Sequence, residues 1–255
     1  MNSILLENET LTSVNENIKL IQKKNGLTFG TDAFLLASFI KAQKNAIAVE
    51  LGGGTGIISL LCASREKLAK IYCLEIQKDF ADIIDRNAQL NSLDNKVSSL
   101  CADVRDIRST DLGFEVDVVF SNPPYMKADS GKRNESDEKY IARHEVCGGI
   151  EEFCHAAARV LRYGGSFYIV YRPDRLSELM AALHKHAFEP KRMTFVHADA
   201  ESEPSMVLIE ARAGGNASLA VTPPLMLHDV QSRGLSHRPL SEAAQRVYDC
   251  MSFDS

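Results

Sequence analysis

Residues 46–61 read AIAVELGGGTGIISLL, an apolar run that passes through a glycine-rich turn into a second apolar run. The first run has the length of a buried strand, and Gly56 to Arg65 is expected to form a helix. Glycines between a strand and a helix permit positive φ and let the backbone approach a ligand closely. This stretch therefore predicts a strand–turn–helix unit whose turn borders a binding site.

The same alternation of strand and helix continues along the chain. Further strands are expected at 69–74, 97–101, 116–121, 166–171, 192–197 and 206–211, and further helices at 78–91, 151–161 and 175–186. The polar segment 198–204 is too short for a crossover helix, so the last two strands should form a hairpin. The pattern predicts an α/β, Rossmann-like doubly wound fold. Its seven-stranded sheet is mostly parallel, with one antiparallel strand near the edge.

The segments on either side of this alternation have their own patterns. Asn25-Gly26 lies between the apolar runs 18–22 and 27–29, which predicts a short N-terminal hairpin. Thr31-Asp32 supplies capping side chains for a helix from Ala33 to Ile40. Apolar residues from Leu240 to Met251 are spaced for one last amphipathic helix. The expected parts are an extension at 1–45 packed on the core, a core domain at 46–213 and a C-terminal tail at 214–255.

Composition excludes several classes of protein. The 255 residues are 45% hydrophobic, which is enough for a sizeable core, and the net charge of −5 argues against an overall basic nucleic-acid binder. There is no run of 18 apolar residues and no signal-peptide pattern at the start. Six cysteines form no C-x-x-C pair. We therefore expect a reduced, cytoplasmic protein with no membrane span, no disulfide and no metal site.

Acidic residues stand at the ends of the first three expected strands. Glu50, Glu75 and Asp103 are these residues, and the carboxyl ends of parallel strands form the edge where open α/β sheets bind ligands. A carboxylate at Glu75 can accept both hydroxyls of a ribose, and Glu50 suits a cationic amine better than a phosphate. The G-x-G-x-G spacing also differs from dinucleotide-binding loops. These features match S-adenosylmethionine, a nucleoside with a charged amino-acid tail.

The fourth strand ends in Asn122-Pro123-Pro124-Tyr125. Two prolines remove two backbone donors, so the Asn122 side-chain oxygen and nearby carbonyls remain as acceptors beside an aromatic ring. Such a set suits a planar amino group, either the exocyclic amine of a base or a side-chain amide. The alternative is a proline-rich turn, which is common after a strand.

Together these motifs resemble the class I S-adenosylmethionine-dependent methyltransferases, in the amino-methyltransferase branch marked by (N/D/S)-P-P-(Y/F/W). Within that branch the chain looks most like the bacterial tRNA1(Val) adenine-N6-methyltransferase family. The additional matching segments are Gly26 to Ala37, Ala142 to Glu145, and Pro223 to Leu225. One departure is Glu50, because the family usually has Asp there. The resemblance implies S-adenosylmethionine as cofactor and tRNA as substrate.

The resemblance also implies a role for each site residue. The Asn122 side-chain oxygen and the Pro123 carbonyl would accept hydrogen bonds from the target amine, and Tyr125 would stack on the base. The implied cofactor-binding residues are Glu50, Gly52, Gly54, Gly56, Glu75, Asp103, Val104, Asn122 and Asp32. Asp32 belongs to an element that would close over the methionine end of the cofactor, although a helix cap explains it equally well.

Three other functions fit parts of the pattern. A protein glutamine-N5-methyltransferase of the release-factor type shares Asn-Pro-Pro-Tyr, but such enzymes usually carry a separate helical N-terminal domain. A DNA adenine methyltransferase would be expected to add a target-recognition domain. A non-catalytic nucleotide-binding module would not need the tetrapeptide. Residues 126–146 are polar and mixed in charge, and they are expected to form a loop or a lid over the substrate.

Overall fold

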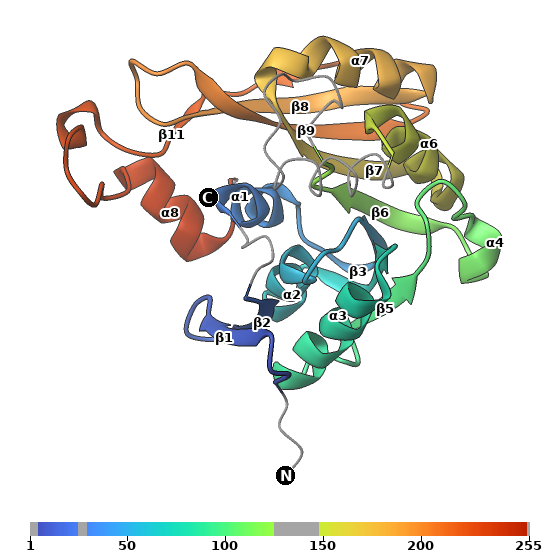
Figure 1. The fold of residues 1–255 in the computed structure, drawn as a ribbon. Helices are drawn as coiled ribbons and strands as arrows, with labels where there is room; N and C mark the ends of the chain where they lie inside the picture. Colours follow the sequence, from blue (N-terminus) through green and yellow to red (C-terminus); the bar gives the residue numbers. More distant parts are fainter. Residues whose placement is uncertain (1–4, 25–29, 125–147, 254–255) are drawn as a thin grey trace, which may run out of the picture.

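The computed structural model describes residues 5–24, 30–124 and 148–253. One large sheet, with helices on both faces, forms the centre of this part of the molecule (Figure 1). Its strands, in spatial order, are β10 (Ala220–Val221), β8 (Phe188–His197), β9 (Pro204–Ala213), β7 (Leu161–Tyr171), β6 (Val116–Ser121), β3 (Gln43–Leu51), β4 (Leu68–Glu75) and β5 (Val97–Cys101). A further strand, β11 (Leu225–Met226), also pairs with β8.

The sheet confirms the predicted doubly wound α/β fold. The strands β3 to β7 are parallel neighbours, and β9 runs antiparallel between β7 and β8. These seven strands are the predicted ones, and β10 and β11 each add two residues beside β8. From β3 the strand order runs outward through β4 to β5, and the chain then returns to place β6 on the other edge of β3. The switch in strand order therefore lies between β3 and β6. Ligands of open α/β sheets bind at the carboxyl ends of strands at such a switch.

Two apolar clusters fill the spaces between the sheet and its helices. The helices are α1 (Thr31–Phe39), α2 (Ile57–Ser64), α3 (Lys78–Leu90), α4 (Ser109–Leu112), α6 (Ile150–Val160), α7 (Leu176–Lys185) and α8 (Glu242–Cys250), with 3₁₀ turns η1 (Pro173–Arg175) and η2 (Val230–Ser232). One cluster joins the sheet to α1, α2, α3 and α8, and the other joins it to α6 and α7. The strands β3 to β9 contribute to both clusters, because successive side chains point to opposite faces of the sheet. In β6, Val118 and Phe120 belong to the first cluster and Val119 belongs to the second.

An N-terminal hairpin is present, and one of its strands is the predicted apolar run at 18–22. β2 (Lys19–Lys23) pairs antiparallel with β1 (Glu9–Ser13). The intervening turn is built on Asn15, whose side-chain oxygen accepts the N–H groups of Asn17 and Ile18 at 2.9 Å each. The predicted partner strand at 27–29 and its Asn-Gly turn lie outside the described residues.

Helix α1 is fixed to the core at its carboxyl end. The Lys67 ammonium, on a residue only 6% exposed, donates to the carbonyls of Ala37 (2.7 Å), Ser38 (3.1 Å) and Ile40 (2.7 Å). These are carbonyls that a helix end leaves without an intrahelical partner, and a cation there also complements the helix dipole. The position of α1, and hence of its first turn, is therefore set by the core.

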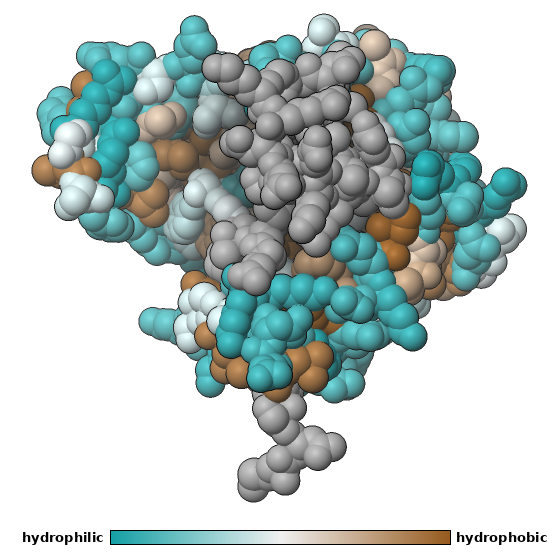
Figure 2. Space-filling view, in the orientation of Figure 1, coloured by the Kyte–Doolittle hydropathy of each residue, from teal (hydrophilic) through white to brown (hydrophobic). Residues whose placement is uncertain are grey.

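The C-terminal helix α8 packs against α1. The rings of Phe34 and Tyr248 are stacked with centroids 4.1 Å apart, and the two helices lie side by side (Figure 1). Among the residues that are coloured by hydropathy in Figure 2, most are hydrophilic, and the hydrophobic ones lie in several small groups. Within the described ranges, no helix is both long enough and apolar enough to cross a membrane.

Candidate active site

The glycine turn after β3 has the conformation that its composition predicts. Gly52, Gly54 and Gly56 have φ values of 74°, 55° and 79°, a region that side chains with a Cβ rarely adopt. The N–H groups of Gly52 and Gly53 both donate to the Leu74 carbonyl at 2.9 Å, which ties the turn to β4. A Cβ added at Gly54 would meet nothing within 4 Å, so this part of the backbone faces open space.

Glu75 lies beside this turn at the end of β4. One carboxylate oxygen accepts the Gly54 N–H and the other accepts the Gln77 N–H, both at 2.9 Å. The residue is 6% exposed, and burial raises the pKa of its carboxyl. The structure thus brings together the glycine turn and the acid that the sequence predicted to share one end of the sheet.

Glu50 lies behind the turn, in the core. Its carboxylate accepts hydrogen bonds from the Ser59 hydroxyl, the Ser59 N–H (3.2 Å) and the Cys73 thiol (3.3 Å). The residue is 1% exposed, and burial raises its pKa from 4.5 to about 7. The sequence did not predict that Ser59 and Cys73 bind the Glu50 carboxylate, because each lies in an apolar run and has no motif around it.

Asp103 follows β5 and is held by a neighbour two residues along. The Arg105 guanidinium contacts both carboxylate oxygens, with Nε 3.0 Å from each, and lowers the pKa of Asp103. Val104 is 7% exposed and belongs to the apolar cluster under α6 and α7. Its carbonyl accepts a hydrogen bond from Arg159 at 2.9 Å. Arg105 is therefore part of the surroundings of any ligand that reaches Asp103.

Asn122 lies at the end of β6, next to the glycine turn. The hydroxyl of Ser121 donates to the Leu51 carbonyl at 2.8 Å, which joins the ends of β6 and β3 at the switch in strand order. The Asn122 amide nitrogen donates to the Asp32 carboxylate at 2.8 Å. Asp32 reaches this point from the first turn of α1, and Pro123 beside Asn122 is buried. The structure thus brings Asp32 to the tetrapeptide, a contact between residues 90 positions apart.

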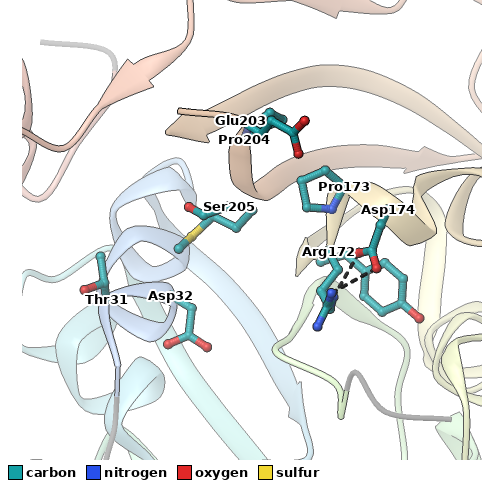
Figure 3. A pocket seen from close by; sticks show the side chains of 10 residues that line it. Thr31, Asp32, Arg172, Pro173, Asp174, Glu203, Pro204 and Ser205 are labelled. Atoms are coloured by element: carbon teal, nitrogen blue, oxygen red, sulfur yellow. Dashed lines mark hydrogen bonds and ion pairs between the residues drawn. The ribbon is translucent and has the colours of Figure 1, made fainter. Parts of the chain in front are cut away.

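A pocket of about 680 Å³ opens beside Asp32. Figure 3 shows the Asp32 carboxylate on one side and the ion pair of Arg172 and Asp174, 2.9 Å apart, on the other. The lining residues are Thr31, Asp32, Tyr171, Arg172, Pro173, Asp174, Glu203, Pro204, Ser205 and Met206. The pocket therefore extends from α1 across the end of β7 to the start of β9, on the side of Asn122 away from β4 and β5.

Two parts of the predicted site, Tyr125 and the segment 126–146, lie outside the described residues. Among the residues that the structure does describe, no group of three or more His, Cys, Asp or Glu side chains is arranged to hold a metal ion.

Known proteins are similar to this chain over most of its length. The family model of the methyltransferase small domain matches residues 23–192. A tRNA1(Val) (adenine(37)-N6)-methyltransferase from Phocaeicola vulgatus is 28% identical over 184 residues, which cover 71% of this chain and 74% of that protein. A protein of the same name from Dyadobacter fermentans is 25% identical over 210 residues, covering 82% of this chain and 85% of that protein.

Solved structures share the fold. A predicted O-methyltransferase from Agrobacterium tumefaciens has a TM-score of 0.69 at 22% identity, covering 87% of this chain and 97% of that one. A tRNA m1G37 methyltransferase from M. jannaschii has a TM-score of 0.55 at 15% identity, covering 82% of this chain and 55% of that one. At these identities, the likeness concerns the arrangement of strands and helices.

Proposed function

Because this chain belongs to the methyltransferase small domain family, it is an S-adenosylmethionine-dependent methyltransferase, and we propose that it methylates the exocyclic N6 amine of an adenine in tRNA. The observation that carries the proposal is the place of Asn122-Pro123-Pro124 at the end of β6, beside the glycine turn. The names of the relatives point the same way, and they make adenine 37 of tRNA1(Val) the first nucleotide to test.

The described residues fit the cofactor. The backbone of Gly54 faces open space, and the Glu75 carboxylate lies beside it at the carboxyl edge of the sheet. We assign Gly52, Gly54 and Gly56 to the methionine part and ribose, and Glu75 to the ribose hydroxyls. Asp103 and Val104 would take the adenine ring, with the Asp103 oxygens shared with Arg105. Glu50 would act across the turn, through its charge, because its carboxylate is buried behind the glycines.

The chemistry requires acceptors more than a strong base. When bound, S-adenosylmethionine supplies an electrophilic methyl group. The lone pair of the adenine amine is delocalised into the ring, so the amine is a weak nucleophile. The Asn122 side-chain oxygen and the Pro123 carbonyl would accept hydrogen bonds from the two N–H groups of this amine. These bonds would localise the lone pair on the nitrogen. The same acceptors stabilise the positive charge that develops on nitrogen as the methyl group arrives. Holding the amine in this orientation supplies the rest of the rate enhancement.

Labelled methyl transfer tests the acceptor. The protein is incubated with methyl-labelled cofactor and either total tRNA or a mixture of release factors, and the tRNA is digested to nucleosides. We expect label in N6-methyladenosine, and its loss when a tRNA1(Val) transcript carries guanosine at position 37. Label in the protein fraction alone would overturn the tRNA proposal in favour of glutamine methylation.

A substitution at Asn122 tests the mechanism. Asn122→Ala should reduce transfer below detection while cofactor binding, measured by calorimetry, stays nearly unchanged, because the lost oxygen faces the acceptor amine. The matched control is Asn95→Ala, which removes an exposed asparagine outside the site and should keep full activity. A near-normal rate in Asn122→Ala would refute the role given to its side-chain oxygen.

A further inference from the structure

Asp32 uses both carboxylate oxygens, and one of them holds Asn122. One oxygen accepts the Ala33 N–H at 2.9 Å, and the other accepts the Asn122 amide nitrogen at 2.8 Å. Asp32 lies in the first turn of α1, where the helix dipole favours a negative charge. An ionised carboxylate has no proton to donate, so its partner in Asn122 must be the NH₂ group.

This contact decides which end of the Asn122 amide faces Asp32. An asparagine amide carries a donor and an acceptor of similar size, and rotation by 180° exchanges them. With the nitrogen bound to Asp32, the oxygen occupies the other branch of the planar amide. In the opposite orientation, the NH₂ group would face the NH₂ group of the substrate, and two donors would oppose each other. The proposed reaction therefore needs the orientation that Asp32 selects.

The carboxylate is also held in place. Lys67 fixes the carboxyl end of α1, and Phe34 in the first turns of the helix stacks on Tyr248. Asp32 is thus presented by a helix anchored at two points. The charge-assisted hydrogen bond that the Asn122 NH₂ group donates to this fixed carboxylate also polarises the amide and makes its oxygen a better acceptor.

We propose that Asp32 is a positioning residue that orients the Asn122 side chain for methyl transfer, a role distinct from cofactor binding. This inference rests on the proposed function, since it assigns Asn122 the acceptor role for the substrate amine. It makes the N-terminal helix a part of the catalytic centre.

Kinetics of Asp32→Asn separates this role from the others. The variant keeps the shape of the side chain but no longer forces the amide nitrogen of Asn122 towards α1. We expect kcat to fall roughly 10- to 100-fold, the range for losing one charge-assisted hydrogen bond. KM for tRNA and the affinity for cofactor should stay within about twofold. Asp94→Asn makes the same chemical change at an exposed residue outside the site and should keep the wild-type kcat. Weaker cofactor binding with an unchanged kcat would overturn the inference.

A charge swap gives a second, sharper test. Asn122→Asp presents an oxygen in either orientation, but its carboxylate is repelled by Asp32, so this single variant should be slow. Adding Asp32→Asn supplies an NH₂ group for the new carboxylate, and we expect the double variant to be faster than Asn122→Asp alone. A purely structural or cofactor-binding role predicts that the second substitution makes the enzyme slower still.

A spectroscopic readout keeps the two proposals apart. In ¹⁵N-labelled protein, the side-chain NH₂ signals of Asn122 should shift in Asp32→Asn and stay in place in Asp94→Asn. Unshifted signals in Asp32→Asn would refute the contact whatever the acceptor. If the wild-type protein methylates no tRNA, the proposed function fails. If it methylates tRNA and Asp32→Asn keeps full kcat, the positioning role fails.

Discussion

Replacing Glu50 by glutamine should stabilise the protein at alkaline pH and leave its stability unchanged at acidic pH. Burial raises the pKa of Glu50 from 4.5 to about 7, so the folded state binds this proton more tightly than the unfolded state does. The free energy of unfolding therefore falls as pH rises from 4.5 to 7. The glutamine variant stays neutral throughout and escapes this loss.

The size of the effect follows from the pKa difference. A rise from 4.5 to about 7 corresponds to about 3 kcal/mol at 1.36 kcal/mol per pKa unit. For a chain of this length, about 3 kcal/mol raises the melting temperature by roughly 6–12 °C. The gain should be fully present near pH 8.5 and absent near pH 4.5, where Glu50 in the wild-type protein is itself protonated.

Thermal unfolding of both proteins, followed by circular dichroism from pH 4.5 to 8.5, measures this difference directly. Every other titrating group is shared, so subtracting one curve from the other isolates Glu50. Glu16→Gln makes the same change at an exposed glutamate, and as the matched control it should change the free energy of unfolding by less than about 0.5 kcal/mol. A gain for Glu50→Gln that is the same at every pH, or a loss at pH 8.5, would refute the reasoning.

Two further substitutions test features that position the site. Lys67→Met should lower the free energy of unfolding by roughly 2–4 kcal/mol in urea titrations, because three carbonyls at the end of α1 lose a charged donor. Lys44→Met makes the same change at an exposed lysine and should alter the free energy of unfolding by less than about 0.5 kcal/mol. Gly54→Ala should weaken binding of S-adenosylmethionine roughly tenfold in calorimetric titrations, because its methyl group would enter the open space beside Glu75. Gly113→Ala has a similar positive φ and open surroundings at the end of α4, so it should share the strain and keep the affinity.

The sequence predicted the central strands well because of how they are buried. Parallel strands covered on both faces read as continuous apolar runs, and β6, with five of its six residues buried, has the predicted bounds. The edge strand β5 also has the predicted bounds, although only Val97 in it is buried. The strand β1 gave no such signal, since four of its five residues are exposed. The predicted hairpin around Asn25-Gly26 stays a prediction, because residues 25–29 lie outside the described part of the chain. β10 and β11 are two residues long, too short for any periodicity.

The site was predictable where topology alone brings residues together. The carboxyl ends of parallel strands meet at one edge, so Glu75, the glycine turn and Asn122 could be grouped from their positions after strands. The contact between Asp32 and Asn122 depends on how α1 packs over the sheet, and no local pattern encodes it. The hydrogen bonds from Ser59 and Cys73 to Glu50 likewise depend on how α2 packs beside β3 and β4. The division of the chain at residues 45 and 213 stays a prediction.

The stacking of α8 on α1 bears on the order in which the molecule is made. During synthesis, β3 can pair with β4 and then with β6 before α8 has been made. Helix α1, although made earlier, gains its last support only when Tyr248 arrives. A nascent chain could therefore complete the cofactor-binding edge well before Asp32 is firmly seated against Asn122. The geometry around Asn122 would then be completed later than the cofactor-binding edge, although α1 is made first.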